Sequence, residues 1–217
     1  MQLRYGKLMV SAIAALAVAG AYASGWTITI NQNTGNVFGP TTGPLGTAAS
    51  VLTYPNPLPQ VYVFPIAGNP YPIAAGDGFP YTAGNSIVRY TVSGPTPITG
   101  VLITTNGRVR GNASISWSKV VIDNDTNRLL LTFTAEFNGS GFGGSDGAIY
   151  NAQFFNFSTP SSNFRVLDTI TVFTLQAPGR DVAFVFQFGQ DFVPEPASML
   201  ALGVGLAGLV GLRRRKK

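Results

Sequence analysis

The segment DNDTN, at residues 123–127, comes closer to a metal-binding loop than any other part of the sequence. Oxygen-bearing side chains occupy its first, third and fifth positions, as they do in the calcium loop of an EF-hand. That loop also needs a glycine at its sixth position and a glutamate at its twelfth, where this chain has Arg128 and Thr134. Because the segment separates two strand-like stretches, we interpret it as a hairpin turn formed by Asx residues and predict no metal site.

Paired carboxylates offer the one catalytic mechanism that the composition leaves open. The chain has no histidine and no cysteine, which excludes a Ser-His-Asp triad, thiolate chemistry, disulfides and the usual zinc ligands. A glycosidase needs only two carboxyl groups at a defined separation. The acidic residues between the two chain ends mostly neighbour Gly, Asn or Arg, and we interpret them as solvated: Asp77, Asp123, Asp125, Glu136, Asp146, Asp168, Asp181 and Asp191. We therefore expect a protein without enzymatic activity and without a cofactor, and keep a glycosidase as the third alternative.

Tyrosine and tryptophan side chains suggest a second chemistry, the binding of sugars. Tyr54, Tyr71 and Tyr81 adjoin prolines and are candidate sugar contacts, because flat aromatic faces can pack against the rings of a polysaccharide. Tyr62, Trp26 and Trp117 extend this set. The competing interpretation, which we favour, places Trp117 in the core and the Tyr-Pro pairs along the edge of a sheet.

Short β-strands must position these side chains. Alternation of apolar and polar residues with a period of two predicts strands at residues 26–31, 86–92, 129–137 and 169–175, and weaker patterns predict strands at 51–54, 61–65, 98–105, 113–122, 148–157 and 182–188. Proline-aromatic pairs place the segment 53–85 at a sheet edge. No stretch of this region has a helical period. We predict an all-β domain at residues 24–192, an antiparallel β-sandwich with a jelly-roll-like arrangement.

The alternation also predicts which side chains point into the core. On the strand at 129–137, Leu129, Leu131, Phe133, Ala135 and Phe137 share one face, and Glu136 points outward. On the last strand we expect the buried face to contain Val182, Phe184, Phe186 and Phe188.

The first 23 residues are typical of a secretory signal peptide. Arg4 and Lys7 precede an apolar run, and Ala21 and Ala23 form an A-x-A cleavage site before Ser24. The apolar run is shorter than the roughly 20 residues of a permanent transmembrane helix. These cations and those of the C-terminus produce the formal charge of +5, while the residues between them are almost neutral. The absence of a cationic stretch in the domain argues against a nucleic-acid partner.

The C-terminal end, residues 193–217, divides into three parts. Pro194, Glu195 and Pro196 disfavour a helix. We expect residues 197–212 to form an apolar helix of about 24 Å, and five cations follow, Arg213, Arg214, Arg215, Lys216 and Lys217. The cations retain the chain end on the cytoplasmic side of a membrane. We expect a transient membrane anchor with an accessible hinge; the alternative is a permanent single-span anchor.

In this order of parts the tail resembles the PEP-CTERM sorting signal of bacterial exported proteins. The resemblance implies recognition by an exosortase, a membrane protease-transpeptidase that would process the chain near Pro194, Glu195 and Pro196. It also implies delivery to the cell surface or beyond, and a link to exopolysaccharide. We therefore expect an exported surface or matrix protein with a structural or adhesive role in a biofilm, with a carbohydrate-binding module as the alternative.

Overall fold

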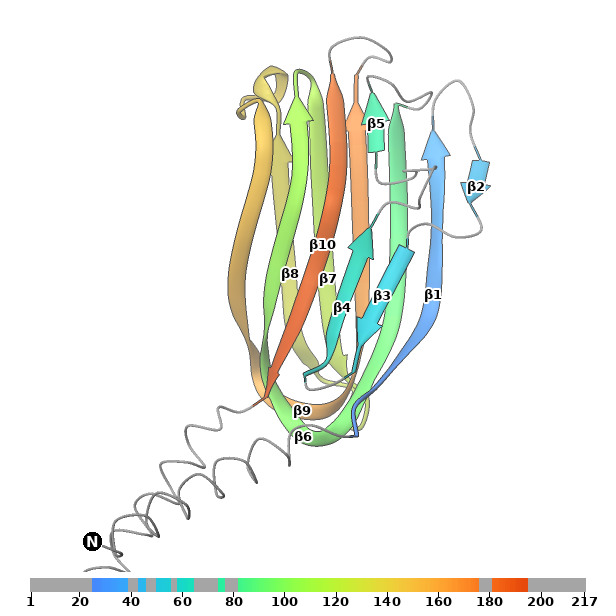
Figure 1. The fold of residues 1–217 in the computed structure, drawn as a ribbon, viewed down its shortest axis with the longest axis vertical. Helices are drawn as coiled ribbons and strands as arrows, with labels where there is room; N and C mark the ends of the chain where they lie inside the picture. The colour runs from blue at the N-terminus through green and yellow to red at the C-terminus, as the bar shows by residue number, and fades with distance from the viewer. Residues whose placement is uncertain are drawn as a thin grey trace, which may run out of the picture.

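The computed structural model describes residues 25–38, 43–45, 50–55, 58–64, 74–76, 82–175 and 181–194, and most of them lie in β-strands (Figure 1). The elements are β1 (Thr27–Phe38), β2 (Gly43–Leu45), β3 (Ser50–Tyr54), β4 (Gln60–Phe64), β5 (Ala74–Gly76), β6 (Ala83–Arg110), β7 (Ala113–Asp123), β8 (Leu129–Asn138), the 3-10 turn η1 (Ser140–Phe142), β9 (Gly147–Thr174) and β10 (Val182–Pro194). The predicted signal peptide and the apolar segment 197–212 lie outside these residues. Within the ranges just given, no helix has the length and apolar character needed to span a membrane.

The strands form one continuous antiparallel sheet. Their order is β3-β4-β10-β6-β9-β7-β8, with β1 joined to β6, β2 to β1 and β5 to β10. The prediction of an all-β, antiparallel domain is therefore confirmed. The edge position predicted for residues 53–85 holds only in part: β3, which ends at Tyr54, lies at the edge of this order and β5 pairs with β10 alone among the described strands, but β4 is paired on both sides, with β3 and β10.

Two long strands, β6 and β9, bend and carry the sheet around a corner. The pairing between them shifts register from Ser93 to Ile98 on β6, opposite Ser161 and Asn163 on β9. The bend of β6 contains Pro95 and Pro97, which lack the N–H group that a regular ladder needs. Figure 1 shows both strands curving at the same end of the molecule and continuing back along it.

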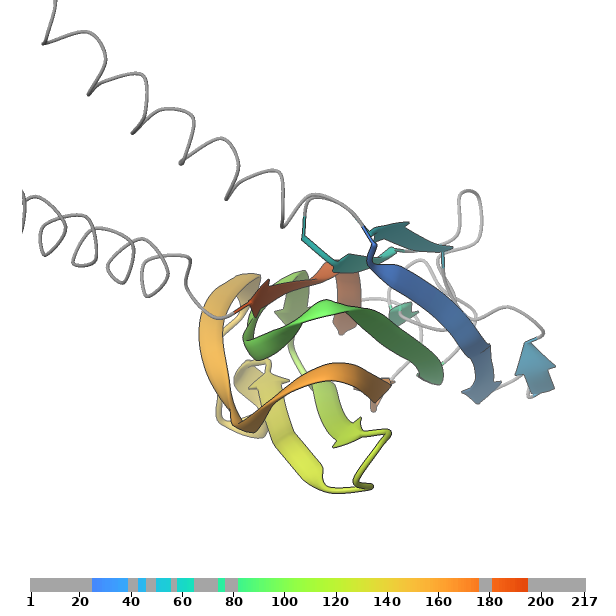
Figure 2. The same ribbon diagram turned by 90° about the horizontal axis from the view of Figure 1, so that it is seen from below.

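The bend divides the sheet into two facing layers. The first contains β1, β6 up to residue 93, β9 from residue 163, β7 and β8; the second contains β3, β4, β10, β6 from residue 98 and the start of β9. Seen end-on in Figure 2, these layers enclose an interior. Trp117 of β7 meets Phe188 of β10 there, with ring centroids 3.4 Å apart. The prediction that Trp117 is a core residue is confirmed.

All ten predicted strands overlap observed strands, with ends that agree to within one residue or lie inside a longer strand, and four of them are parts of longer strands. Residues 86–92 and 98–105 both belong to β6, and residues 148–157 and 169–175 both belong to β9. The layers are consequently parts of one hydrogen-bonded sheet rather than two separate sheets. Alternation alone did not reveal this, because a bend interrupts the side-chain period in the same way as a turn does.

The predicted buried face of β10 is wrong for most of its members. The pairing of β10 with β6 shifts between Val185 and Gln187, a β-bulge that moves the following side chains to the other face. Ala183, Val185 and Phe188 are buried, whereas Phe186 is 47% exposed. The wrongly assigned side chains are Val182, Phe184 and Phe186.

On β8, a second bulge makes the prediction wrong for one residue, Leu129. The register between β7 and β8 shifts where Val121 and Ile122 pair with Leu131 and Leu129. Leu129 is therefore exposed, while Leu131, Phe133 and Phe137 pack on the core as predicted. Glu136 points outward, also as predicted.

Candidate functional site

A groove lies on the outer face of the second layer and has a volume of about 240 Å³. Strands far apart in the sequence supply its lining: Tyr62 from β4, Thr104, Thr105 and Asn106 from β6, Tyr150 from β9, and Gln187 and Asp191 from β10. All of them lie in β-strands, so the groove is formed by the sheet and not by loops.

The strand register explains why the surface is hollow here. Tyr62, Gly189, Thr104 and Ala152 are successive neighbours across four strands, so their positions form one row over the outer face. Gly189 has no side chain and Ala152 has only a methyl group, so the surface along this row is depressed at these positions. A Cβ atom on Gly189 would lie 2.4 Å from Oγ1 of Thr104 and 2.8 Å from the Tyr62 ring. The close approach of these side chains therefore requires glycine.

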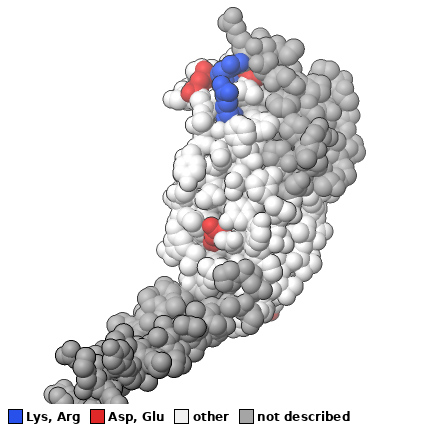
Figure 3. Space-filling view, in the orientation of Figure 1, with Lys and Arg blue, Asp and Glu red and all other residues white. Residues whose placement is uncertain are grey.

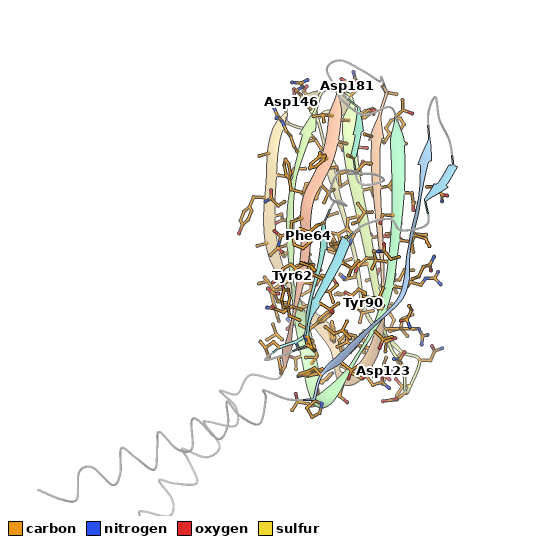
Figure 4. The ribbon with its side chains drawn as sticks, turned by 45° about the vertical axis from the view of Figure 1, so that its right-hand side comes forward. Tyr62, Phe64, Tyr90, Asp123, Asp146 and Asp181 are labelled. Atoms are coloured by element: carbon orange, nitrogen blue, oxygen red, sulfur yellow. The ribbon has the colours of Figure 1, made fainter. Side chains whose placement is uncertain are left out.

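Aromatic side chains form the two sides of the groove. Tyr150 on β9 is 80% exposed, so its ring faces solvent above the sheet. On the opposite side, Tyr62 contacts Tyr54 edge-to-face at 6.0 Å and stacks with Phe64 at 6.3 Å, both measured between ring centroids. Figure 4 shows Tyr62 and Phe64 along the same strand, away from Asp146 and Asp181 at one end and Asp123 at the other. The aromatic cluster of Tyr54, Tyr62 and Phe64 is thus a rigid wall.

The polar side chains of the groove can bond to hydroxyl groups. The Tyr62 hydroxyl donates a hydrogen bond of 2.7 Å to Oδ1 of Asp191. Because a carboxylate accepts several hydrogen bonds, Asp191 can also accept one from a ligand hydroxyl. Thr104, Asn106 and Gln187 add hydroxyl and amide groups that both donate and accept. Charged side chains gather at one end of this face and leave most of it uncharged, as Figure 3 shows.

Burial of Tyr62 and its bond to Asp191 raise the pKa of Tyr62 from 10.0 to about 12. Desolvation is the largest cause, followed by the hydrogen bond to the carboxylate, which binds the protonated phenol. Because the folded pKa lies above the unfolded value, this pair contributes stability that is complete below pH 10 and is lost as the pH rises towards about 12.

Titration of tyrosinate absorbance tests this shift. The difference between the wild type and the Tyr62→Phe variant should show one phenol that ionises near pH 12. In Asp191→Asn the pKa of Tyr62 should fall only part of the way, because burial of the ring remains. A difference curve with its midpoint at the ordinary tyrosine pKa would contradict the hydrogen bond between Tyr62 and Asp191.

Of the three tyrosines predicted as sugar contacts, the structure places one beside the groove. Tyr54 is half exposed and adjoins the groove through Tyr62, whereas Tyr71 and Tyr81 lie outside the described residues. Tyr150 was missed, although its position in a predicted strand made an outward-facing ring foreseeable. Trp26 is buried like Trp117, which removes both tryptophans from the candidate sugar contacts.

The residues of the two chain ends lie almost entirely outside the described part of the chain. This holds for Ala21, Ala23 and Ser24, for Glu195 and Pro196, and for Arg213, Arg214, Arg215, Lys216 and Lys217. Pro194 is described: it is buried, ends β10 and pairs with Ile98 at the bend of β6. The sheet therefore leads directly into the tail.

The DNDTN segment is the hairpin turn that was predicted. Oδ1 of Asp123 accepts hydrogen bonds from the N–H and the hydroxyl of Thr126 at 2.6 and 2.7 Å. A hydrogen bond with the Ser161 side chain, and next the two bonds from Thr126, hold the pKa of Asp123 below its usual value. Nδ2 of Asn163 donates to Asp125 at 2.7 Å. The side chains of the turn thus bond within the chain.

The interpretation of the acidic residues as solvated is wrong for Asp123, Asp168 and Asp181, which are buried. Asp181 is buried, and its Oδ1 accepts a hydrogen bond from the N–H of Asn112 at 3.1 Å. Asp168 is completely buried between the layers. The alternation of β9 did contain this information, because Asp168 shares a face with Val166 and Ile170. Composition around the residue was a weaker guide than position in the strand.

Lys119 and Asp168 form an ion pair in the core. They are direct neighbours across β7 and β9, with Nζ 2.6 Å from Oδ1, and neither side chain has any exposed surface. Gln190 of β10 joins them from the facing layer: Lys119 Nζ donates to Oε1 at 2.6 Å, and Nε2 donates to Oδ2 of Asp168 at 2.9 Å. The Tyr90 hydroxyl donates to the same Oε1, and Trp117 Nε1 donates to Asp168 at 3.3 Å.

The C-terminal end matches the PEP-CTERM protein-sorting motif over residues 192–216, which confirms the resemblance noted in the sequence. The motif indicates an exported protein that an exosortase sorts. No curated protein matches the chain.

Several solved structures resemble the domain at low TM-scores. The carbohydrate-binding module TmCBM61, solved with beta-1,4-galactotriose, aligns over 78% of this chain and 88% of its own, with 9% identity and a TM-score of 0.30. The CBM36-1 domain of a xylanase from the hindgut metagenome of Trinervitermes trinervoides aligns over 76% and 95%, with 14% identity and a TM-score of 0.26. The isomalto-dextranase of Arthrobacter globiformis T6, complexed with panose, aligns over 76% and 23%, with 9% identity and a TM-score of 0.29. At these scores the similarity gives no ground for assigning a function.

Proposed function

We propose that this exported protein works at the cell surface or in the extracellular polysaccharide matrix, where its β-sandwich domain, jelly-roll-like in shape, has a structural or adhesive role in a biofilm. The outer groove is the surface through which it would bind exopolysaccharide. A carbohydrate-binding module is thus the mode of action that we infer for the domain, and sorting by the tail brings it to its ligand.

The observation that carries this proposal is the arrangement of Tyr62 and Tyr150 on either side of a hollow lined with hydroxyl, amide and carboxylate groups. A sugar ring has apolar faces, which pack on aromatic rings, and a rim of hydroxyls, which bond to such polar groups. The sheet holds both kinds of group in place before a ligand binds, which lowers the entropic cost of binding. A groove open to solvent suits a chain polymer better than a small enclosed molecule.

Binding fits this groove better than hydrolysis does. Asp191 is the one carboxylate among the described residues that line it. A retaining or inverting glycosidase needs two carboxyl groups about 5 to 10 Å apart on either side of the scissile bond. A glycosidase therefore stays the third alternative, and a matrix protein without a specific ligand is the second.

A glycan array probed with the exported protein recovered from its host tests the proposal. We expect binding to neutral polysaccharides, since no lysine or arginine lines the described part of the groove. Competition with the same soluble polysaccharide should remove the signal. Absence of binding to every neutral and acidic glycan would reject the carbohydrate-binding function and leave the passive matrix role.

Processing of the tail would follow export. An exosortase would cleave near Pro194, Glu195 and Pro196, residues 197–212 would span the membrane transiently, and the cations Arg213 to Lys217 would keep the chain end in the cytoplasm until then. Because Pro194 is buried at the end of β10, cleavage on its C-terminal side would leave the sheet intact.

Mass spectrometry of the protein from host cells checks this processing. The mature chain should lack Leu212 and the five cations, and should start at Ser24. The Glu195→Ala variant should retain the tail and stay in the membrane fraction, whereas Glu136→Ala, an exposed acid on β8, should be processed normally. Recovery of wild-type chains with Leu212 still attached would instead favour a permanent anchor.

A further inference from the structure

Lys119 occupies an unusual position for a lysine, because its amino group ends inside the core between the two layers. Its Nζ lies 5.7 to 5.9 Å from the ring centroids of Trp117, Tyr90 and Phe188, and the side chain has no exposed surface. Buried lysines are rare unless they are paired. An amino group in such a site is a nucleophile if it can lose a proton.

The groups around Nζ are those that an acyl transfer needs. The carboxamide of Gln190 has its Oε1 2.6 Å from Nζ, so its electrophilic carbonyl carbon lies one bond beyond an oxygen that contacts the amine. Oε1 also accepts a hydrogen bond from Tyr90, which would stabilise negative charge on that oxygen. Asp168 contacts both partners: Oδ1 is 2.6 Å from Nζ and Oδ2 accepts from Nε2 of Gln190 at 2.9 Å.

We propose that Lys119 and Gln190 join in an intramolecular isopeptide bond, and that Asp168 carries the protons of the reaction. Asp168 takes a proton from Lys119, and the free amine attacks Cδ of Gln190 to form a tetrahedral intermediate. Its oxyanion is held by the Tyr90 hydroxyl. Asp168 passes that proton to Nε2 and takes a second one from the attacking nitrogen. The carbonyl of Cδ then re-forms as the bond from Cδ to Nε2 breaks and ammonia leaves, and Asp168 gives the second proton to the ammonia, which departs as ammonium.

The balance of the reaction needs nothing from outside the chain. Lys119 begins as an ammonium group and loses two protons, the Gln190 amide nitrogen gains both, and Asp168 returns to its carboxylate. No oxidant or reductant takes part. Burial lowers the pKa of Lys119, which eases the first proton transfer, although the Asp168 carboxylate opposes this effect in part. The site is also closed to bulk water, which would otherwise compete for the electrophile.

The bond would cross-link the two layers at the middle of the domain. Lys119 lies on β7 in the first layer and Gln190 lies on β10 in the second, 71 residues further along the chain. β10 is also the strand that leads into the sorting tail. A pull on the C-terminal end would therefore reach β7 through a covalent bond at Gln190, and the pairs of β10 with β6 that precede Gln190 would not have to separate first.

Tryptic digestion of the full chain followed by mass spectrometry tests the proposal. Trypsin should not cleave after a lysine whose nitrogen is in an amide, so peptide 111–128 should appear attached to the peptide that begins at Asp181. The mass of this pair should be lower than the sum of its parts by one ammonia. Recovery of two separate peptides, one ending at Lys119 and one beginning at Val120, would overturn the proposal. Loss of one water and attachment to peptide 166–180 would place the bond on Asp168 and overturn the assignment to Gln190.

Two variants and a control examine the mechanism. Asp168→Asn should leave Lys119 unattached, because the amide cannot accept its proton. Since that variant could also fail to fold, Tyr90→Phe provides a milder change: it keeps the ring in the core and should lower the attached fraction several-fold early after synthesis. Ser118→Ala, on the opposite side of β7 from Lys119, should leave that fraction unchanged. If the fraction of chains with the Lys119–Gln190 bond were the same in Tyr90→Phe as in the wild type, the proposed role of Tyr90 in stabilising the oxyanion would be wrong.

Discussion

Replacement of Asp168 by alanine should lower the free energy of unfolding by about 3–5 kcal/mol, the range seen when one partner of a buried ion pair is removed. The alanine leaves the Lys119 amino group in the core without its carboxylate partner, and it also leaves Nε2 of Gln190 and Nε1 of Trp117 without an acceptor. Burial of an unpaired charge or donor is costly because water cannot reach it. Loss of the isopeptide bond would add to this effect.

Chemical denaturation followed by tryptophan fluorescence measures the change. Glu136→Ala is the matched control, since it removes a carboxylate from the solvent-facing side of β8 and should alter the unfolding free energy by less than about 0.5 kcal/mol. A loss below about 1 kcal/mol for Asp168→Ala would mean that the core tolerates an unpaired Lys119, contrary to the enclosed geometry described above.

The second large effect is expected at the groove, where Tyr150→Ala should weaken binding of the matrix polysaccharide by about 30-fold, as for an aromatic residue at the centre of a binding surface. Tyr150 forms one side of the groove, and its removal leaves the sugar only the wall formed by Tyr62 on the other. Because the Tyr150 ring is 80% exposed, its loss should leave the melting temperature almost unchanged.

Affinity electrophoresis in gels that contain the polysaccharide measures this loss. Phe142→Ala provides the control, because Phe142 is also an exposed aromatic residue but stacks with Phe173 outside the groove. Equal mobility of Tyr150→Ala and the wild type in the presence of ligand, with normal folding of both, would place the binding surface elsewhere.

Local patterns were sufficient for the strands, because a period of two is a property of neighbouring residues. They failed where a bulge places one extra residue in a strand and shifts the alternation of its side chains. Near Phe186 and near Leu129, the side chains on the two sides of the bulge no longer follow one alternation, so residues before it do not share the face of those after it. No local signal distinguishes such a residue from its neighbours, since the bulge is imposed by the register of the partner strand.

The candidate site depended even more on distant parts of the chain. Tyr62 and Asp191 are 129 residues apart and Lys119 and Asp168 are 49 apart, so their contacts exist only after β4, β10, β7 and β9 have paired. The alternation of β7 did place Lys119 on the same face as Trp117 and Val121. That position agrees with burial of the lysine, which the sequence analysis did not predict, but the pattern does not show which groups meet it from the facing layer.

What the sequence determined by itself is the all-β class, the turn at residues 123–127 and the sorting tail, because each depends on contiguous residues whose spacing or order carries the information. The tertiary structure alone decided that one bent sheet forms both layers, that Gly189 lies low between two tyrosines, and that Gln190 approaches Lys119. These features arise from strand order and register, which bring residues from separate strands within bonding distance.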